Sequence, residues 1–213
     1  MSPDLTVHVA LLILTLSIFF LLLKLLSKRA LTNIHYKTNR ATLQSGRHLA
    51  QASHHLAQAR STPHRAQSQA HAKTSLSEAE KALSLAPRDP SAHVLRAMAL
   101  DLVDRKAAAL RSLHVALSPP CVKSLAARER ADALIKRAEL KIEVNRRRRV
   151  DSAVQDLVEA VRIGGDEPRA LGLLGQCYEW KGMRDEAKEA YEKSLRVGPG
   201  SIVARQGLDR LGP

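Results

Sequence analysis

A 34-residue spacing between small, aliphatic and aromatic positions is the feature that most restricts how this chain folds. Six positions in residues 140–165 each precede a position of similar character by that interval. The matched pairs are Leu140 with Leu174, Val144 with Tyr178, Ala153 with Ala187, Leu157 with Tyr191, Ala160 with Ser194, and Gly165 with Pro199. Self-similarity at this period predicts a stack of helix pairs, in which neighbours cover one another's hydrophobic faces.

A second register repeats at the same interval earlier in the chain. Ser75, Ala79 and Ala82 precede Ala109, Leu113 and Ala116 by 34 residues, whereas Ala109 and Ala153 are 44 residues apart. The difference predicts about ten extra residues near the stretch SPPCVKSLAA. Proline and glycine clusters occur where one helix pair is expected to end and the next to begin.

The composition agrees with an all-α fold. Apolar residues make up 45% of the chain but aromatic residues only 3%, so alanine and leucine must build the core. A core of that kind suits closely packed helices, because sandwiches and barrels draw on alternating runs of β-branched and aromatic residues. The two cysteines, Cys121 and Cys177, are expected to be small buried hydrophobes in a reducing compartment.

The stretch from Gly172 to Gly200 resembles the tetratricopeptide repeat (TPR). The resemblance rests on the spacing of Gly175, Tyr178, Gly182, Ala187, Tyr191, Ser194 and Pro199. It is strongest over residues 168–201 and extends to 90–165. It implies a TPR-like α-solenoid of about three to four helix pairs over residues 63–213, whose leading helices present a concave surface to a protein or peptide partner. An array of helical hairpins without true repeat geometry is the alternative.

The resemblance also implies which residues face a partner. The concave face is expected to include Met98, Asp101, Ile142, Asn145, Arg169, Gln176 and Glu179. The alternative is that several of them pack against a neighbouring helix. The carboxylate clamp by which some TPR adaptors hold chaperone termini is not matched, because the corresponding places carry Val94, Met98, Ile135, Glu139, Gly172 and Gln176.

An uncharged apolar run follows a short N-terminal flank at residues 1–4. Residues 5–23 contain no formally charged side chain, and 19 residues of helix roughly match the hydrocarbon core of a bilayer. We therefore expect an uncleaved transmembrane signal-anchor helix over residues 5–26, with a cleaved signal peptide as the alternative. Basic residues follow the run, which predicts a single-pass protein of the endoplasmic reticulum or an organelle outer membrane with its C-terminal domain in the cytosol.

A basic segment lies directly behind this run. No acidic residue occurs between Asp4 and Glu78. Residues 27–62 are expected to form a basic membrane-proximal helix, which together with the transmembrane helix would precede the repeats. An anionic membrane surface is expected to attract six residues of this region, Lys37, Arg40, Arg47, Arg60, Arg65 and Lys73.

The sequence offers no catalytic, cofactor-binding or metal-binding site. The stretch GGDE at residues 164–167 is best read as a helix end followed by an acidic helix start. The histidines of the basic segment have no carboxylate nearby in sequence to orient them. The stretch Asn145 to Arg149, with its four consecutive arginines, is expected to form a solvent-facing turn within the third pair. Trp180 is expected to pack, and the lack of an aromatic platform beside basic residues argues against nucleic acid.

The sequence as a whole favours a non-enzymatic adaptor. It predicts a membrane-anchored, cytosol-facing TPR-like protein that binds a protein partner and holds it at a membrane. One alternative is an import or assembly factor of an organelle outer membrane. The other is an RNA-binding or enzymatic subunit whose site the sequence does not reveal.

Overall fold

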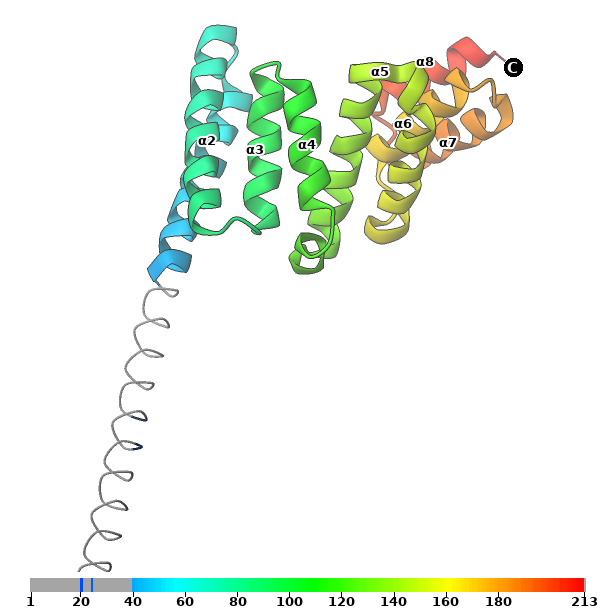
Figure 1. Cartoon of the computed structure of the whole chain (residues 1–213). Helices are drawn as coiled ribbons and strands as arrows, with labels where there is room; N and C mark the ends of the chain where they lie inside the picture. The colour runs from blue at the N-terminus through cyan, green and yellow to red at the C-terminus, as the bar shows by residue number, and fades with distance from the viewer. Residues whose placement is uncertain (1–19, 21–23, 25–39, 213) are drawn as a thin grey trace, which may run out of the picture. The chain divides into compact units, whose positions relative to one another are not determined.

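The structure, a computed structural model, describes residues 20, 24 and 40–212 (Figure 1). Every regular element of that part is helical, which confirms the all-α prediction. Residues 40–61 are helical. The elements that follow are α2 (Arg65–Leu85), α3 (Pro90–Leu102), α4 (Lys106–Ala116), the 3-10 helix η1 (Cys121–Ser124), α5 (Ala127–Gly164), α6 (Pro168–Trp180), α7 (Arg184–Val197) and α8 (Ile202–Leu211).

The chain divides into two compact units, residues 1–44 and 45–213. Within the second unit each helix packs on its neighbours in the chain, so that α2 to α7 lie side by side in sequence order (Figure 1). A smaller contact skips a helix, since α8 folds back onto α6 as well as onto α7. Packing between sequence neighbours is the arrangement that the 34-residue period predicts.

Proline, aspartate and glycine set the helix limits. Pro90 and Pro168 occupy first-turn positions of α3 and α6, where the missing amide hydrogen removes no helical bond. The Asp89 carboxylate caps α3 by accepting the amide of Ser91 at 2.9 Å. The α3–α4 and α6–α7 turns each contain one residue with positive φ, Asp104 at 61° and Gly182 at 75°. Both residue types tolerate this left-handed conformation, so the two turns are alike.

The predicted insertion lies between α4 and α5. Residues 117–126 join these helices and include η1, whereas residues 86–89 suffice between α2 and α3. Cys121 and Leu125 of the insertion are buried and anchor it to the array. The extra residues therefore form a packed connection and lengthen neither helix.

The third pair is one element, α5, that turns back on itself at Asn145. Asn145 has extended backbone angles, φ −162° and ψ 88°, inside α5. Its side-chain oxygen accepts the amide of Arg148 at 3.2 Å and so caps the second half. The predicted turn over Asn145 to Arg149 is therefore wrong in extent. Since one residue breaks the helix, the arginines already belong to the second half.

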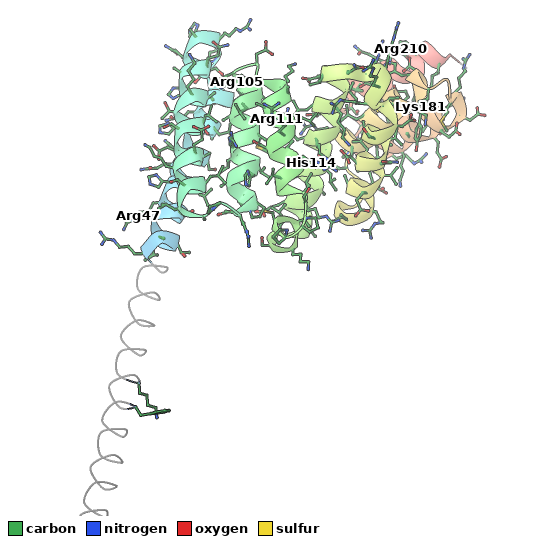
Figure 2. The ribbon with its side chains drawn as sticks, viewed as in Figure 1. Arg47, Arg105, Arg111, His114, Lys181 and Arg210 are labelled. Carbon is green, nitrogen blue, oxygen red and sulfur yellow. The ribbon has the colours of Figure 1, made fainter. Side chains whose placement is uncertain are left out.

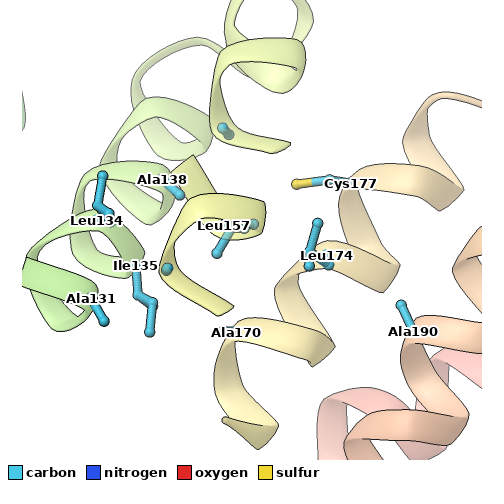
Figure 3. Close-up of a cluster of buried hydrophobic side chains, with 11 residues drawn as sticks. Ala131, Leu134, Ile135, Ala138, Leu157, Ala170, Leu174, Cys177 and Ala190 are labelled. Atoms are coloured by element: carbon cyan, nitrogen blue, oxygen red, sulfur yellow. The ribbon is translucent and has the colours of Figure 1, made fainter. Parts of the chain in front are cut away.

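The core is built from alanine and leucine, as expected. Figure 3 shows a cluster in which Ala131, Leu134 and Ile135 of α5 face Leu157 of its second half and Leu174 of α6. All five side chains are buried. Small residues let the helices approach closely, and each fully buried leucine contributes about 1.5–3 kcal/mol relative to an exposed one.

The ring of Tyr191 on α7 packs between α6 and α8. The ring is fully buried. A Cβ atom placed on Gly175 of α6 would lie 2.4 Å from the ring, and one placed on Gly207 of α8 would lie 2.3 Å from it. The two glycines therefore hold the ring between them, and the predicted crossing at Gly175 is present.

The compact unit begins at Ser45, inside the segment 27–62 that the sequence assigned to a separate helix. Buried faces of the helix at residues 40–61 and of α2 meet through Ala52, Leu56 and alanines of α2. Ser75 Oγ donates to the carbonyl of Ala52 at 2.8 Å, and Ser68 Oγ to that of Ala59 at 2.6 Å. Leu43, expected on the apolar stripe, is 70% exposed. Residues 45–61 therefore act as the leading helix of a first pair.

The predicted membrane localisation is contradicted. Across residues 20, 24 and 40–212, no helix is both long enough and apolar enough to cross a membrane. Even α5, the longest of these helices, carries charged side chains along its whole length. The prediction of a single-pass protein with a cytosolic C-terminal domain is corrected accordingly. The expected span at residues 5–26 lies outside the described residues, except for Phe20 and Lys24.

Candidate functional site

Two hollows lie along the leading helices of the pairs. The first, of about 490 Å³, is lined by Arg60, Met98, Asp101, Leu102, Asp132, Lys136 and Arg169. The second, of about 550 Å³, lies between α6, α8 and the Glu139 side of α5, with Leu173, Ile202 and Val203 among its walls. Arg169 lines both hollows. We call the two hollows together the leading-helix groove.

A chain of ion pairs runs across the floor of this groove. Lys136 Nζ on α5 lies 2.6 Å from an Asp101 oxygen on α3 and 3.3 Å from a Glu139 oxygen one turn along its own helix. Glu139 also receives Arg169 of α6, whose Nε lies 2.7 Å from Oε1. Three successive leading helices are thereby joined through charges of which Asp101, Lys136 and Glu139 are partly buried and Arg169 is exposed. These contacts orient the side chains before any partner arrives, which lowers the cost of ordering them on binding.

Two charges of the groove have no opposite charge beside them. Arg60 contacts the sulfur of Met98 at 3.2 Å but forms no ion pair with any described residue. Asp132, one turn before Lys136, is exposed and likewise has no ion pair within the part that the structure describes. Met98 and Leu102 supply apolar surface in the same hollow. The first hollow therefore offers one free cation, one free carboxylate and an apolar wall.

The seven residues predicted for partner binding divide between several environments. Met98, Asp101 and Arg169 line the first hollow together. Gln176 lies half-buried on α6, one turn after Gly172 of the second hollow. The other three, Ile142, Asn145 and Glu179, have structural roles.

Each of those three is explained by a contact within the chain. Ile142 packs against the core cluster of the third pair, and Asn145 caps the second half of α5. The Glu179 carboxylate accepts two hydrogen bonds from Arg210 of α8 at 2.9 Å and one from the Tyr191 hydroxyl at 2.8 Å. These bonds, that of Arg210 foremost, hold the pKa of Glu179 below its usual value.

Arg60, Leu102, Asp132, Lys136 and Glu139 also line the groove but were not among the predicted partner-binding residues. On α5 a signal was present, because Asp132, Lys136 and Glu139 follow one another at four- and three-residue spacing and so share a helix face. Arg60 was missed for a different reason. The sequence assigned it to a membrane-proximal helix, whereas it ends the leading helix of the first pair.

The six basic residues predicted to meet an anionic surface are not all on one side. Arg40 and Arg47 are exposed on the first described helix, and Arg65 and Lys73 are exposed on α2 (Figure 2 labels Arg47). Arg60 instead lines the groove. The thirteen residues that separate it from Arg47 on the same helix amount to a rotation of about 220° at 100° per residue. Lys37 lies outside the described residues.

Two sequence interpretations change with the structure in view. His48 has a carboxylate beside it after all, because its Nδ1 lies 2.7 Å from Glu78 Oε2 across the first pair. Trp180 supplies an aromatic ring beside the arginine run, with the Arg146 guanidinium 4.9 Å from the ring centroid. That guanidinium lies over one face of the ring, but Trp180 remains 39% exposed, so the predicted packing of this residue is only partial.

Other polar clusters are structural. Gly164 ends α5, Gly165 has a φ of 84°, and Asp166 pairs with Lys193 at 2.7 Å, so the stretch GGDE is a helix boundary. Cys121 and Cys177 are buried and free, and burial raises the pKa of the Cys177 thiol to about 12. Within the described residues, no three histidine, cysteine, aspartate or glutamate side chains are grouped to hold a metal ion.

The order of paired helices and their packing give this chain the fold of TPR proteins. Several solved structures share it. One is a MamA protein, which matches with a TM-score of 0.62 and 17% identity over 79% of this chain and 80% of that one. YrrB, described as a TPR protein with an unusual peptide-binding site, matches with a TM-score of 0.55 and 18% identity over 66% of this chain and 67% of its own.

A third similar structure is TTC0263, a thermophilic TPR protein of Thermus thermophilus. It matches with a TM-score of 0.55 and 17% identity over 75% of this chain and 80% of that one. No family model matches the chain, and no curated protein matches it significantly. The likeness to solved structures therefore concerns the fold.

Proposed function

We propose that this chain is a non-enzymatic adaptor that binds a peptide segment of a protein partner in the leading-helix groove. The observation that carries the proposal is the ion-pair chain from Asp101 through Lys136 and Glu139 to Arg169. It prepares a continuous surface across three helices, beside which Arg60 and Asp132 form no ion pair with any residue that the structure describes. Peptide binding by YrrB, a protein of the same fold, supports the same function.

The groove also defines the partner's chemistry. An apolar side chain of the partner would cover Met98 and Leu102, which line the first hollow. An acidic side chain would meet Arg60, and a basic side chain would meet Asp132. Since paired charges set register and exclude wrong partners, this arrangement selects a segment of mixed charge over a uniformly acidic tail.

The experiment is selection from a random peptide display library against the full chain. Peptides enriched by the parent should contain an apolar residue flanked by one acidic and one basic residue. The variant Asp132→Lys should enrich peptides in which the basic residue is replaced by an acidic one. The variant Arg60→Glu should enrich peptides in which the acidic residue is replaced by a basic one.

Lys188→Glu is the control, because this exposed residue lies on α7, outside the groove. It changes the net charge of the chain as Arg60→Glu does and should enrich the same peptides as the parent. Identical enrichment by the parent and by both groove variants would refute binding in the groove.

Binding of the basic segment to an anionic surface is a separate proposal. It rests on exposed Arg40, Arg47, Arg65 and Lys73, with Lys37 outside the described residues. We also propose that the functional repeat domain includes residues 45–62, because their buried face belongs to the same compact unit as the repeats.

A further inference from the structure

A second pocket lies away from the leading-helix groove, between α4 and both halves of α5. Its volume is about 650 Å³. Leu110, Val115 and Val144 form an aliphatic wall, in which Val115 is 43% exposed and Val144 38% exposed. A single exposed apolar side chain lowers stability only slightly. Grouped in one pocket, these side chains form an apolar surface that a ligand can cover and so remove from water.

The polar lining of this α4–α5 pocket is basic. Arg111, Arg137, Lys141 and Arg149 line it, and Asp156 is the only acidic side chain among the lining residues. Four basic groups against one acidic group leave an excess of three positive charges, with His114 counted as neutral. Such an excess of positive charge gathered in one hollow attracts anions more strongly than the same charges spread over a flat surface.

Two of the cations share the one carboxylate. Arg137 donates to both Asp156 oxygens, at 2.6 and 2.8 Å, and Lys141 Nζ lies 2.7 Å from Oδ2. Burial lowers the pKa of Lys141, while its bond to Asp156 acts in the opposite direction. A single carboxylate thus compensates one of the two positive charges at the floor of the pocket.

The remaining cations are available to a ligand. Neither Arg111 nor Arg149 forms an ion pair with any residue that the structure describes. Arg111 and His114 lie one turn apart on α4, as Figure 2 shows, and both line the pocket. Arg149 faces the same space from the first turn of the second half of α5.

We infer that the α4–α5 pocket is a second docking site, which binds an acidic segment of a protein partner through carboxylates at Arg111 and Arg149 and an aliphatic side chain against Val115 and Val144. Guanidinium groups bind carboxylates in two-pronged geometry, which gives such a contact direction as well as strength. The inference goes beyond the proposed function, because it uses different residues and a partner of different charge.

The pocket fits protein better than nucleic acid. A phosphate backbone would satisfy the arginines but has no aliphatic group to cover Val115 and Val144. Among the lining residues that the structure describes there is no phenylalanine, tyrosine or tryptophan to stack a base. A segment that alternates glutamate or aspartate with leucine supplies both kinds of contact at once.

The test is fluorescence anisotropy of the full chain with short labelled probes. One peptide alternates glutamate with leucine, a second replaces each glutamate with glutamine, and a third replaces each leucine with serine. A single-stranded oligonucleotide is the fourth probe. The first peptide should bind, with affinity that falls as salt rises, and the other three should bind at least tenfold more weakly.

The variant Arg111→Gln with Arg149→Gln should weaken the first peptide at least tenfold. The matched control is Arg105→Gln with Lys188→Gln, which removes two exposed positive charges outside the pocket and should leave the affinity within about twofold. Equal weakening by both pairs of changes would mean non-specific attraction to a basic chain and would overturn the inference. Equal or tighter binding of the oligonucleotide, or no binding of the first peptide, would overturn it too.

The groove variant Asp132→Lys separates this inference from the proposed function. Asp132 does not line the α4–α5 pocket, so the change should not weaken the glutamate–leucine peptide. Loss of binding in Asp132→Lys together with retention in the Arg111 and Arg149 variant would place that peptide in the groove and refute the second site.

Discussion

Replacing Gly175 with alanine should destabilise the chain, although alanine is the better helix former. The added Cβ would lie 2.4 Å from Tyr191 Cε1 and 2.5 Å from Cδ1, far inside van der Waals contact. The ring cannot move away easily. Gly207 of α8 presses on its other side, the side chain is fully buried, and its hydroxyl is bonded to Glu179 at 2.8 Å.

Two opposing terms set the magnitude. Overpacking a well-filled site costs about 1–3 kcal/mol, and a site enclosed on both sides belongs near the upper end of that range. Replacing a helical glycine by alanine stabilises the helix by about 1 kcal/mol, because alanine has the higher helix propensity. The free energy of unfolding should therefore fall by about 1–2 kcal/mol, which for a chain of this size lowers Tm by about 2–8 °C.

The assay is thermal and urea unfolding of the full chain, followed by circular dichroism. Gly172→Ala is the matched control, three residues earlier on the same helix. Its Cβ would meet its nearest atoms, Ser194 Oγ and Val203 Cγ1, at 3.6 Å, which is ordinary contact. The free energy of unfolding of that variant should stay the same or rise by up to about 1 kcal/mol, and its Tm should not fall. Equal behaviour of the two variants would refute the account of Tyr191 as an immobile ring between two glycines.

Three further predictions follow from charged groups. Asp156→Ala should lower the free energy of unfolding by about 1–3 kcal/mol in urea titrations, because it leaves the partly buried Arg137 and Lys141 without their counter-charge, whereas Lys141→Met should cost less because Asp156 keeps both bonds from Arg137. Since Glu179 has a lowered pKa in the folded chain, its stabilisation is present at neutral pH and lost as pH falls through that lowered value. Glu179→Gln should thus be less stable than the parent at pH 7, and the stabilities of the two, measured at several pH values, should converge only once the pH falls below the lowered pKa of Glu179. Glutamine at Lys37, Arg40, Arg47, Arg60, Arg65 and Lys73 should abolish sedimentation with anionic vesicles, while Arg60→Gln alone should have little effect because Arg60 faces the groove. Unchanged sedimentation of the six-residue variant would exclude these residues as the binding segment.

Much of the fold could be predicted because its signals are local. The spacing of Gly175, Ala187 and Tyr191 reports a helix crossing that any such pair must make, and the structure places Gly175 against Tyr191. The interval between Ala109 and Ala153 similarly revealed the connection at residues 117–126. Periodicity records which faces are buried, and burial is what makes the pairs stack.

The first pair was harder to recognise from sequence. Its leading helix carries basic and histidine residues on its exposed side, and its buried side offers mainly alanine and serine. Such a face has little hydrophobic contrast, so charge dominated the interpretation of residues 27–62. The partner for its buried side, α2, follows closely in the chain, but hydropathy alone does not indicate the serine-to-carbonyl bonds that join them.

The groove was predicted only in part, because its decisive contacts join different helices. Met98, Asp101 and Arg169 could be placed on leading helices by spacing. The ion pairs depend on how three helices are rotated against one another. They link Asp101, Lys136, Glu139 and Arg169. A register argument fixes that rotation to within a face, not to within an ion pair, so it did not reveal that Ile142 and Glu179 make contacts within the chain.

The contact between the two helices of the first pair is formed mainly by serine and alanine, which has a consequence for local unfolding. Apart from Leu56, the fully buried side chains of residues 45–61 and α2 are alanines and serines, and α3 is the one later helix on which α2 packs extensively. At the other end α6, α7 and α8 close around one tyrosine ring. In a linear array of repeats, each helix pair is stabilised only by its neighbours. The pair with the smallest buried contact therefore unfolds locally most often. Amide hydrogens of residues 45–61 should therefore exchange with solvent long before those around Tyr191, which gives the molecule one labile end and one persistent end.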